Sequence, residues 1–412
     1  MKVLKLTVEE ATDAAAVQAA IDRVAALGGG RVALPEMTVT LDRGIELRSD
    51  VELTGQGKMT VLRKGPGRMY PLSGYHNYGM CDVPLQTVDG LKVGMTVSVE
   101  DNLRGGFYGT FARITWIDGC WVGLDHGIEM DYTADQSPVL ATVFPLVFGH
   151  GIANAAVRDL TLDGRLADQP KPMNGCRGAA VYFARSRDIE ISGVQVSDYH
   201  GEGIGWQMCR DVRVLDSVVN GSSGNGIHPG AGSTNCLVRG CSAADNRQSG
   251  FFFCVRANRI TVAGCRFTNN DIGISIGARD CHNLIEDCEI TQNRGPGVLL
   301  RETPEPIAVH DCEVRNCTVT ANATVHGDGQ IVVPADAHDI AITANHIQGT
   351  PSRPGPGVSA DAGTARLHLA GNKFVDCRPE IAAPDGVLVD AAASIECGYG
   401  TGADTAYRHL ST

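Results

Sequence analysis

Two stretches of the chain, Gly250-Phe-Phe-Phe-Cys-Val-Arg256 and Gly273-Ile-Ser-Ile-Gly-Ala-Arg279, show the repeat that decides the fold. Glycines in the same setting recur every 23 to 25 residues, at Gly178, Gly203, Gly226, Gly250, Gly273 and Gly297. The repeats are rich in Val, Ile, Phe and Asn and show little helical periodicity. A period this short predicts a solenoid in which each repeat adds one coil of short strands.

The residues that follow each glycine predict which side chains fill the solenoid. The first and third positions are apolar, and alternate side chains of a strand point to the same face. We therefore expect two interior columns. The first is Ala179, Ile204, Ile227, Phe251, Ile274 and Val298, and the second is Val181, Trp206, Pro229, Phe253, Ile276 and Leu300.

Two further columns lie later in each repeat, and we interpret both as structural. A cysteine follows the glycine by fifteen residues, at Cys241, Cys265, Cys288 and Cys312, and an asparagine comes five residues later, at Asn246, Asn270 and Asn293. Buried thiols pack as small apolar groups, and asparagine side chains bond along turns. The cysteines are a whole coil apart and lack the close spacing of a metal site.

The remainder of the chain predicts caps and one insertion. Residues 1–57 should hold an amphipathic helix over 9–27, which closes the open end of the solenoid, and the first coils. Residues 58–146 break the period and suggest a small β-rich insertion. Regular coils are expected over 147–375, and a C-terminal cap over 376–412.

Composition limits the partners. The 412 residues carry a formal net charge of −12, which argues against nucleic acid as a partner. No apolar run is long enough to cross a membrane, and the first residues contain no signal-peptide core. With 14 cysteines, a reduced, cytoplasmic protein is expected, or a secreted or periplasmic one if a signal was removed. The sequence leaves a homo-oligomer and a calcium ion open and requires no metal.

The N-terminal part also resembles a known group of proteins. The run from Asp13 to Asp22, followed by Gly28 to Pro35 and Gly44 to Gly55, is similar to the opening of the pectate lyase and rhamnogalacturonase-like group. This group belongs to the right-handed parallel β-helix proteins of the pectin-lyase-like superfamily. The resemblance implies an all-β, right-handed parallel β-helix with a substrate cleft along one parallel sheet. The superfamily includes lyases, hydrolases, epimerases, transferases and tailspikes, so the fold alone does not select the reaction.

One hydrolase pattern of that superfamily is not carried over. Gly273-Ile-Ser-Ile-Gly277 is similar to a segment of polygalacturonases, but the residue before it is Ile272 where those enzymes have histidine. Hydrolysis of a glycosidic bond generally needs two carboxyl groups. The second and fourth positions after each glycine, which should point outward, contain no Asp or Glu.

The outward positions and adjoining turns supply the candidate site. His228 is the first choice, because an imidazole suits proton transfer near neutral pH. The arginines would bind a carboxylate through the guanidinium fork. As catalytic candidates we take His228, Arg256, Tyr182, Glu202 and Asp280. As substrate-binding candidates we take Arg301, Gln207, His200 and Arg279.

These residues favour an enzyme that cleaves a polysaccharide or oligosaccharide by β-elimination. Elimination from a uronic acid needs a base for the C5 proton and a donor that stabilises the carboxylate-derived enolate. A C5 epimerase begins with the same proton removal. One alternative is a glycoside hydrolase or transglycosylase that uses the rim carboxylates Glu202 and Asp280. Another is a glycan-binding, tailspike-like protein.

Overall fold

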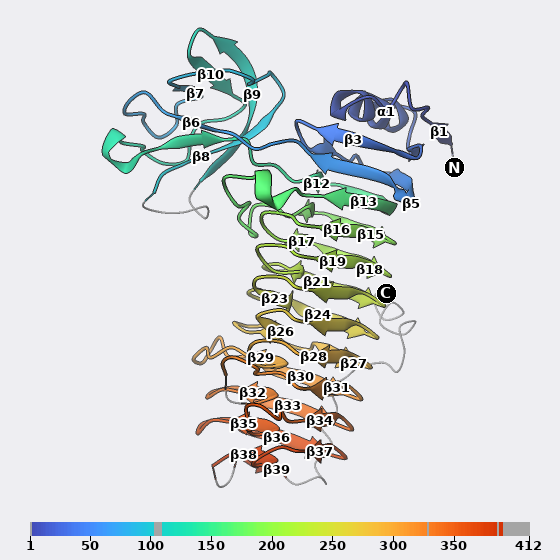
Figure 1. The fold of residues 1–412 in the computed structure, drawn as a ribbon, viewed down its shortest axis with the longest axis vertical. Coiled ribbons are helices and arrows are strands. Elements are labelled where there is room, and N and C mark those ends of the chain that lie inside the picture. The colour runs from blue at the N-terminus through green and yellow to red at the C-terminus, as the bar shows by residue number, and fades with distance from the viewer. Residues whose placement is uncertain (1, 103–108, 328, 385–386, 390–412) are drawn as a thin grey trace.

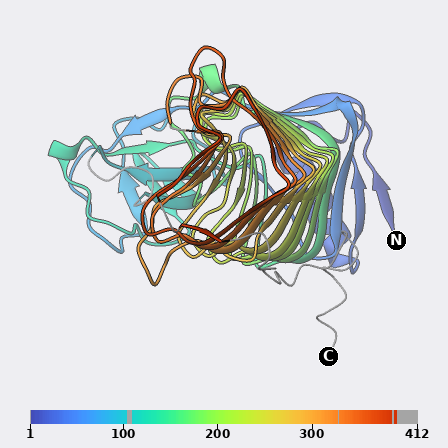
Figure 2. The same cartoon turned by 90° about the horizontal axis from the view of Figure 1, so that it is seen from below.

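A column of stacked coils forms most of the molecule (Figure 1). The computed structural model describes residues 2–102, 109–327, 329–384 and 387–389. Viewed along the column, successive coils superpose around a common interior (Figure 2). A typical coil holds three short strands, for example β17 (Ile204–Gln207), β18 (Arg210–Leu215) and β19 (Val218–Asn220). Each strand pairs in parallel with its equivalents on neighbouring coils, which is the arrangement that the sequence predicted.

Two parallel sheets run the length of the column. The eleven-stranded sheet carries the glycine repeat and consists of β4 (Ile45–Glu46), β12 (Val147–His150), β14 (Val181–Ala184), β17, β20 (Ile227–Pro229), β23 (Ser249–Phe252), β26 (Ile272–Ile276), β29 (Val298–Leu300), β32 (Ile331–Val333), β35 (Val358–Ala360) and β38 (Ile381–Ala382).

The other two strands of each coil belong to the twenty-two-stranded sheet. Its members are β1 (Val3–Lys5), β2 (Gly30–Ala33), β3 (Met37–Leu41), β5 (Val51–Lys64), β13 (Ala153–Asp163), β15 (Arg187–Ser192), β16 (Gln195–Ser197), β18, β19, β21 (Thr234–Arg239), β22 (Ser242–Ala244), β24 (Asn258–Ala263), β25 (Arg266–Thr268), β27 (Leu284–Glu286), β28 (Glu289–Thr291), β30 (His310–Arg315), β31 (Thr318–Thr320), β33 (His338–Thr343), β34 (His346–Gln348), β36 (Ala365–Ala370), β37 (Lys373–Val375) and β39 (Leu388–Val389).

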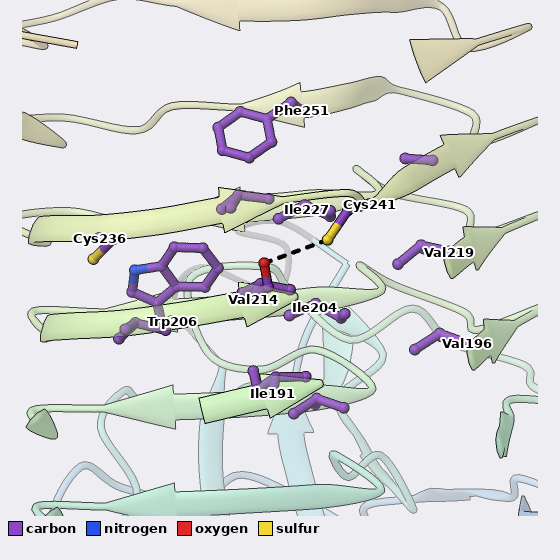
Figure 3. Close-up of a cluster of buried hydrophobic side chains, with 14 of the residues drawn as sticks. Ile191, Val196, Ile204, Trp206, Val214, Val219, Ile227, Cys236, Cys241 and Phe251 are labelled. Atoms are coloured by element: carbon purple, nitrogen blue, oxygen red, sulfur yellow. Dashed lines mark hydrogen bonds between the residues drawn. The ribbon is translucent and has the colours of Figure 1, made fainter. Parts of the chain in front are cut away.

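The predicted interior columns are confirmed. Ile204 pairs with Ile227, Ile227 with Phe251, and Phe251 with Ile274, so the first column stacks coil on coil. These side chains are fully buried, and so is Trp206 in the second column (Figure 3). Burial of an aliphatic or aromatic side chain stabilises a fold by about 1.5–3 kcal/mol. The repeated interior therefore holds the column together.

The asparagine column forms a hydrogen-bonded ladder. The backbone N–H of Asn246 donates to Oδ1 of Asn270 (3.1 Å), and that of Asn270 donates to Oδ1 of Asn293 (2.9 Å). The ladder continues to Asn322, whose Oδ1 accepts from the Asn293 backbone (3.1 Å). Each side-chain oxygen thus accepts a buried backbone N–H group from the turn of the preceding coil, as predicted.

The cysteine column is confirmed for three of its four members. The backbone N–H of Cys241 donates to Sγ of Cys265 (3.4 Å), and the thiol of Cys265 in turn contacts Cys288. The prediction for Cys312 was wrong, because the next member is Cys317. Extra residues between β29 and β30 lengthen this coil, so that 29 residues separate Cys288 from Cys317. As a result, Cys312 stacks on Asn283 of the preceding coil instead of on Cys288.

The N-terminal cap is the helix α1 (Ala14–Ala26). It is shorter than the predicted 9–27, because Oδ1 of Asp13 accepts the backbone N–H of Ala16 (2.9 Å) and so fixes the start. Its apolar face, which includes Val17, Ile21 and Val24, is buried against the first coils (Figure 1).

The insertion is an antiparallel sheet beside the N-terminal coils (Figure 1). Its strands are β6 (Met69–Pro71), β7 (Asp82–Pro84), β8 (Thr96–Glu100), β9 (Thr110–Asp118), β10 (Trp121–Leu124) and β11 (Val139–Ala141), with the 3-10 turn η1 (Ala134–Gln136). They lie inside the predicted 58–146 and enclose a separate apolar core. At the other end, β38 and β39 continue the coils past residue 375, and residues 390–412 of the predicted C-terminal cap lie outside the described residues.

Candidate functional site

The candidate site lies on the eleven-stranded sheet near the middle of the column. His228 is the central residue of β20, and its coil lies between β17 and β23. Glu202 comes two residues before β17, and Cys254 two residues after β23. Three consecutive coils therefore bring an acid, an imidazole and a thiol to one place on the sheet.

Glu202 and His228 form a buried pair. Nδ1 of His228 contacts Oε2 of Glu202, and their side chains are only 3% and 8% exposed. The other oxygen, Oε1, accepts a hydrogen bond from Nδ2 of Asn225 (2.7 Å). Both carboxylate oxygens are thus occupied, as buried charges require.

This pairing decides the protonation state of His228. Burial alone would lower the pKa of the imidazole, but the charge of Glu202 and the contact with it, together with the nearby Cys254 thiol, raise the pKa to about 10. The sequence prediction assumed an ordinary histidine that exchanges a proton near neutrality. The buried pair instead makes His228 an imidazolium at neutral pH, which is a proton donor.

The second ring nitrogen of His228 has no geometric hydrogen-bond partner. Nε2 is buried and unpaired among the residues that the structure describes. The Cys254 thiol lies near enough to influence the imidazole without meeting the full geometry of a hydrogen bond. The ring of Phe252 stands edge-on to the imidazole, with centroids 5.2 Å apart. Nε2 is therefore the atom of the buried pair that is free for further chemistry.

A loop between β13 and β14 covers the pair. Gly175 lies so close that a Cβ at this position would overlap the Glu202 carboxyl group. The Tyr182 hydroxyl donates to the Cys176 carbonyl (3.0 Å), and Arg177 forms an ion pair with Glu129 of the insertion (3.0 Å). Tyr182 is itself buried, and burial raises its pKa. Tyr182, predicted as a catalytic residue, thus positions the covering loop.

Beneath this loop is a cavity of about 530 Å³. Side chains from the loop and from three coils line it. They include Asn174, Cys176, His200, Glu202, Asn225, His228, Arg247, Gln248, Phe252 and Cys254. Glu202 is the single carboxylate in this lining. The cavity is large enough for a small part of a polymeric ligand.

His200 differs from His228 in its electrostatic surroundings. Its Nδ1 lies 2.9 Å from the carbonyl oxygen of Gln169. A carbonyl only accepts, so Nδ1 carries the hydrogen and Nε2 keeps a lone pair when the ring is neutral. Burial, with the charges of Arg247 and Lys64, lowers the pKa of His200. The same cavity is thus lined by His200, whose neutral form is favoured, and by His228, whose protonated form is favoured.

Arg301 and Gln207 lie near the cavity but are engaged by the protein. Arg301 donates to Ser275 Oγ (2.7 Å) and to the Phe253 carbonyl (2.8 Å), and its guanidinium stacks on Phe252 at 4.2 Å. Oε1 of Gln207 accepts the Ala231 backbone N–H (2.7 Å). Neither residue lines the cavity, so their predicted contact with substrate would have to occur outside it.

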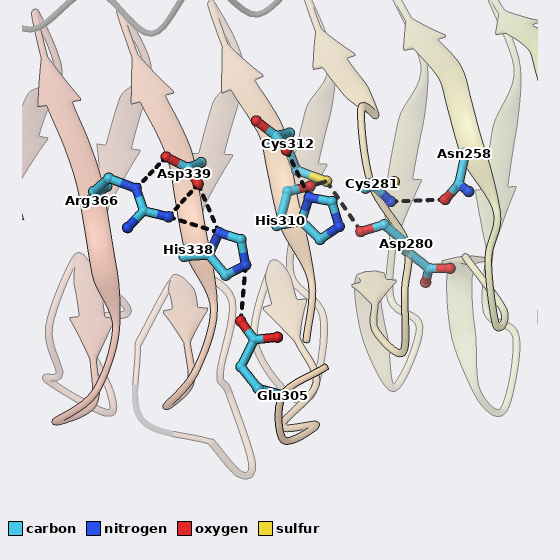
Figure 4. Close-up of polar contacts among 10 residues, drawn as sticks. Asn258, Asp280, Cys281, Glu305, His310, Cys312, His338, Asp339 and Arg366 are labelled. Atoms are coloured by element: carbon cyan, nitrogen blue, oxygen red, sulfur yellow. Dashed lines mark hydrogen bonds and ion pairs between the residues drawn. The ribbon is translucent and has the colours of Figure 1, made fainter. Parts of the chain in front are cut away.

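Three other predicted residues are not brought to His228. Arg256 and Arg279 are exposed in turns of positive φ, outside the cavity. Asp280 was expected at a rim but is fully buried, and its carboxylate accepts the backbone N–H groups of Ala257 (2.9 Å) and Gly277 (2.8 Å). Burial raises its pKa. Asp280 fixes a turn, and it lies between Asn258 and His310 among the polar side chains drawn in Figure 4.

Sequence reasoning missed Cys254, Cys176, Arg247 and the role of Asn225. A signal for Cys254 existed, because it occupies the outward fourth position after Gly250, away from the structural cysteine column. The covering loop carries no repeat, so the position of Cys176 could not be read from periodicity. In the described part of the chain, no group of three or more His, Cys, Asp or Glu side chains could hold a metal ion. Nor do these residues include a helix long and apolar enough to cross a membrane.

Comparisons with known proteins agree with this architecture. Residues 179–374 match the family model described as a right handed beta helix region. The structure is similar to the A-module of mannuronan C-5 epimerase AlgE6 from Azotobacter vinelandii, with a TM-score of 0.61 and 17% identity over 92% of this chain and 94% of that chain. It is also similar to the polygalacturonase of Erwinia carotovora ssp. carotovora, with a TM-score of 0.58 and 12% identity over 94% and 95% of the two chains. Comparison with curated protein sequences gives no match.

These findings define the class of fold. The chain folds as a right-handed parallel β-helix. At identities of 12% and 17%, the likeness to the two solved structures concerns the fold, and the reaction has to be argued from the site.

Proposed function

We propose that this protein is an enzyme that acts on a uronate-containing glycan and cleaves it by β-elimination in the cavity around His228. The observation that carries the proposal is the pair of histidines whose surroundings move their pKa values in opposite directions. Burial and nearby cations lower the pKa of His200, while Glu202 and Cys254 together raise that of His228 to about 10. Such opposed pairs are typical of general acid–base catalysis.

The two histidines have complementary roles in this proposal. Neutral His200, with Nδ1–H bonded to a carbonyl, presents Nε2 as the base that removes the C5 proton of a uronate. Protonated His228 donates to the departing glycosidic oxygen. Glu202 keeps His228 protonated and takes no direct part in bond cleavage.

Arg247 supplies the positive charge that this reaction needs. It lines the cavity, it is exposed, and it forms no ion pair with another described residue. A guanidinium fork suits a sugar carboxylate, whose negative charge grows as the C5 proton leaves. The net charge of −12 for the whole protein is consistent with this contact, because only the surface around Arg247 has to be cationic.

Hydrolysis is less well supported by the same geometry. A hydrolase generally uses two carboxyl groups astride the scissile bond. The lining contains one carboxylate, and both of its oxygens already contact His228 and Asn225. The second rim candidate, Asp280, is buried and bonded to backbone amides.

The test is a screen on uronate polysaccharides and on neutral glycans, read by ultraviolet absorbance and by reducing ends. We expect ultraviolet-absorbing ends from a uronate polymer. His200→Gln and His228→Gln should each lower turnover by about a hundredfold or more, since general acid–base catalysis contributes roughly 10²–10⁴-fold. Arg247→Gln should mainly raise KM.

Matched controls come from exposed residues outside the cavity. His326→Gln and Arg266→Gln remove the same side-chain types from the surface and should leave turnover unchanged. Inversion at C5 without cleavage would reassign the site to epimerisation. Cleavage that neither histidine variant slows would contradict the proposed roles.

A further inference from the structure

The Cys254 thiol differs from the structural cysteines of the coils. Cys241, Cys265 and Cys288 are buried in the interior column. Cys254 is partly exposed and lines the cavity, and its backbone N–H is bonded to the Pro229 carbonyl (3.0 Å) of the coil that carries His228. Its sulfur is therefore held on the sheet and is open to small molecules.

Two side chains, Glu202 and His228, form a buried pair behind this thiol. Glu202 contacts Nδ1 of His228, whose Nε2 is buried and unpartnered, and His228 and Cys254 line the same cavity. In this order an acid orients an imidazole and the imidazole activates a nucleophile. Interaction with Cys176 and with the charged His228 lowers the pKa of Cys254. The proposed elimination does not use the thiol.

A second thiol faces the first from the covering loop. Cys176 lines the same cavity and interacts directly with the Cys254 side chain. Both cysteines are free thiols. Two hydrogen bonds hold Cys176 in place. Its carbonyl accepts from the Tyr182 hydroxyl, and its backbone N–H donates to Oδ1 of Asn174 (3.0 Å).

We propose that Cys254 is a reactive thiolate that is modified by soft electrophiles and peroxides, and that Cys176 is its resolving thiol. Attack of the thiolate on hydrogen peroxide forms an S–O bond and breaks the O–O bond, and the leaving hydroxide takes a proton to become water. The sulfenic acid then condenses with the Cys176 thiol, which forms the disulfide and releases a second water. Two thiols are oxidised and one peroxide is reduced.

Alkylation with iodoacetamide between pH 8 and pH 6, followed by peptide mapping, tests the thiolate. The exposed Cys81 and Cys120 serve as references in the same molecule. The labelling rate of an ordinary exposed cysteine falls roughly 70-fold over this range. We expect that of Cys254 to change less than threefold, and His228→Gln to restore a steep fall. A fall for Cys254 parallel to the references in the wild-type protein would overturn the proposal.

Peroxide treatment of the intact protein tests the resolving thiol. We expect non-reducing peptide maps to contain a disulfide between Cys176 and Cys254, and Cys176→Ser to accumulate a sulfenic acid at Cys254 that dimedone traps. Oxidation that gives neither product while Cys81 is oxidised would refute the pairing. Both experiments are done without a glycan, so their failure is distinct from failure of the proposed elimination.

Discussion

Replacing Glu202 by Gln probes the electrostatic basis of the site. The substitution keeps the shape of the side chain and an oxygen for Asn225 or His228, but it removes the negative charge beside Nδ1 of His228. Burial, which lowers the pKa of His228, stays the same. The variant therefore isolates the effect of one charge on one imidazole.

The magnitude follows from the position of the pair. The pKa of His228 is raised from 6.5 to about 10 by Glu202 and Cys254 together. A single adjacent charge accounts for roughly 1–3 pH units of such a change. Glu202→Gln should lower the pKa of His228 by that amount, which corresponds to roughly 1.4–4 kcal/mol.

The same pair predicts how stability depends on pH. Because the folded-state pKa of His228 is raised, protonation of His228 stabilises the fold fully below pH 6.5, and this contribution is lost as the pH rises towards about 10. Glu202→Gln should lower the free energy of unfolding most at pH 6 and least at pH 10. Wild type and variant should therefore converge in stability as the pH rises.

The assay is an NMR titration of the histidine ring protons, with His228→Gln to assign the signal. Asp271→Asn is the matched control, because it removes a partly exposed carboxylate 3.0 Å from His326 and should leave His228 unaffected. A wild-type His228 that titrates near 6.5, or one that Glu202→Gln does not move, would refute the reasoning.

Two further predictions concern the covering loop and the column. Gly175→Ala should displace the loop from Glu202, which should lower the free energy of unfolding by about 1–3 kcal/mol and slow turnover. Gly355→Ala is the control and should do neither, because a Cβ at this position meets nothing within 4 Å. Equal urea midpoints and equal rates for the two variants would contradict the close packing at Gly175. Asn270→Ala should lower the free energy of unfolding by about 1–3 kcal/mol for each buried group that it leaves unpaired, whereas Asn220→Ala, at an exposed position, should have little effect. Urea denaturation measures both, and an unchanged midpoint for Asn270→Ala would argue against the asparagine ladder.

The fold could be predicted because one pattern is repeated in every coil. Glycine spacing fixes the register, and the register places Ile204, Ile227 and Phe251 in one column without reference to distant residues. The prediction for Cys312 failed where the repeat changes length, because a fixed offset from Gly297 ignores the longer turn before β30.

The site could be predicted only in part, because part of it lies outside the repeat. The outward position of His228 and its proximity to Glu202 follow from the coil register. Burial by the loop around Gly175 does not follow from the register, and neither does the protonation of the buried ring, which Glu202 and Cys254 favour against the effect of burial. Likewise, sequence reasoning placed Asp280 at a rim because it follows the outward strand positions, whereas its carboxylate accepts hydrogen bonds from buried backbone amides.

The most direct test of the central claim is the mass of the products formed from a uronate polymer in water enriched in heavy oxygen. Elimination through His200 and His228 predicts unsaturated ends that carry no solvent oxygen and absorb ultraviolet light. Saturated ends that carry one heavy oxygen atom would show that water attacks the glycosidic bond, and would contradict the account.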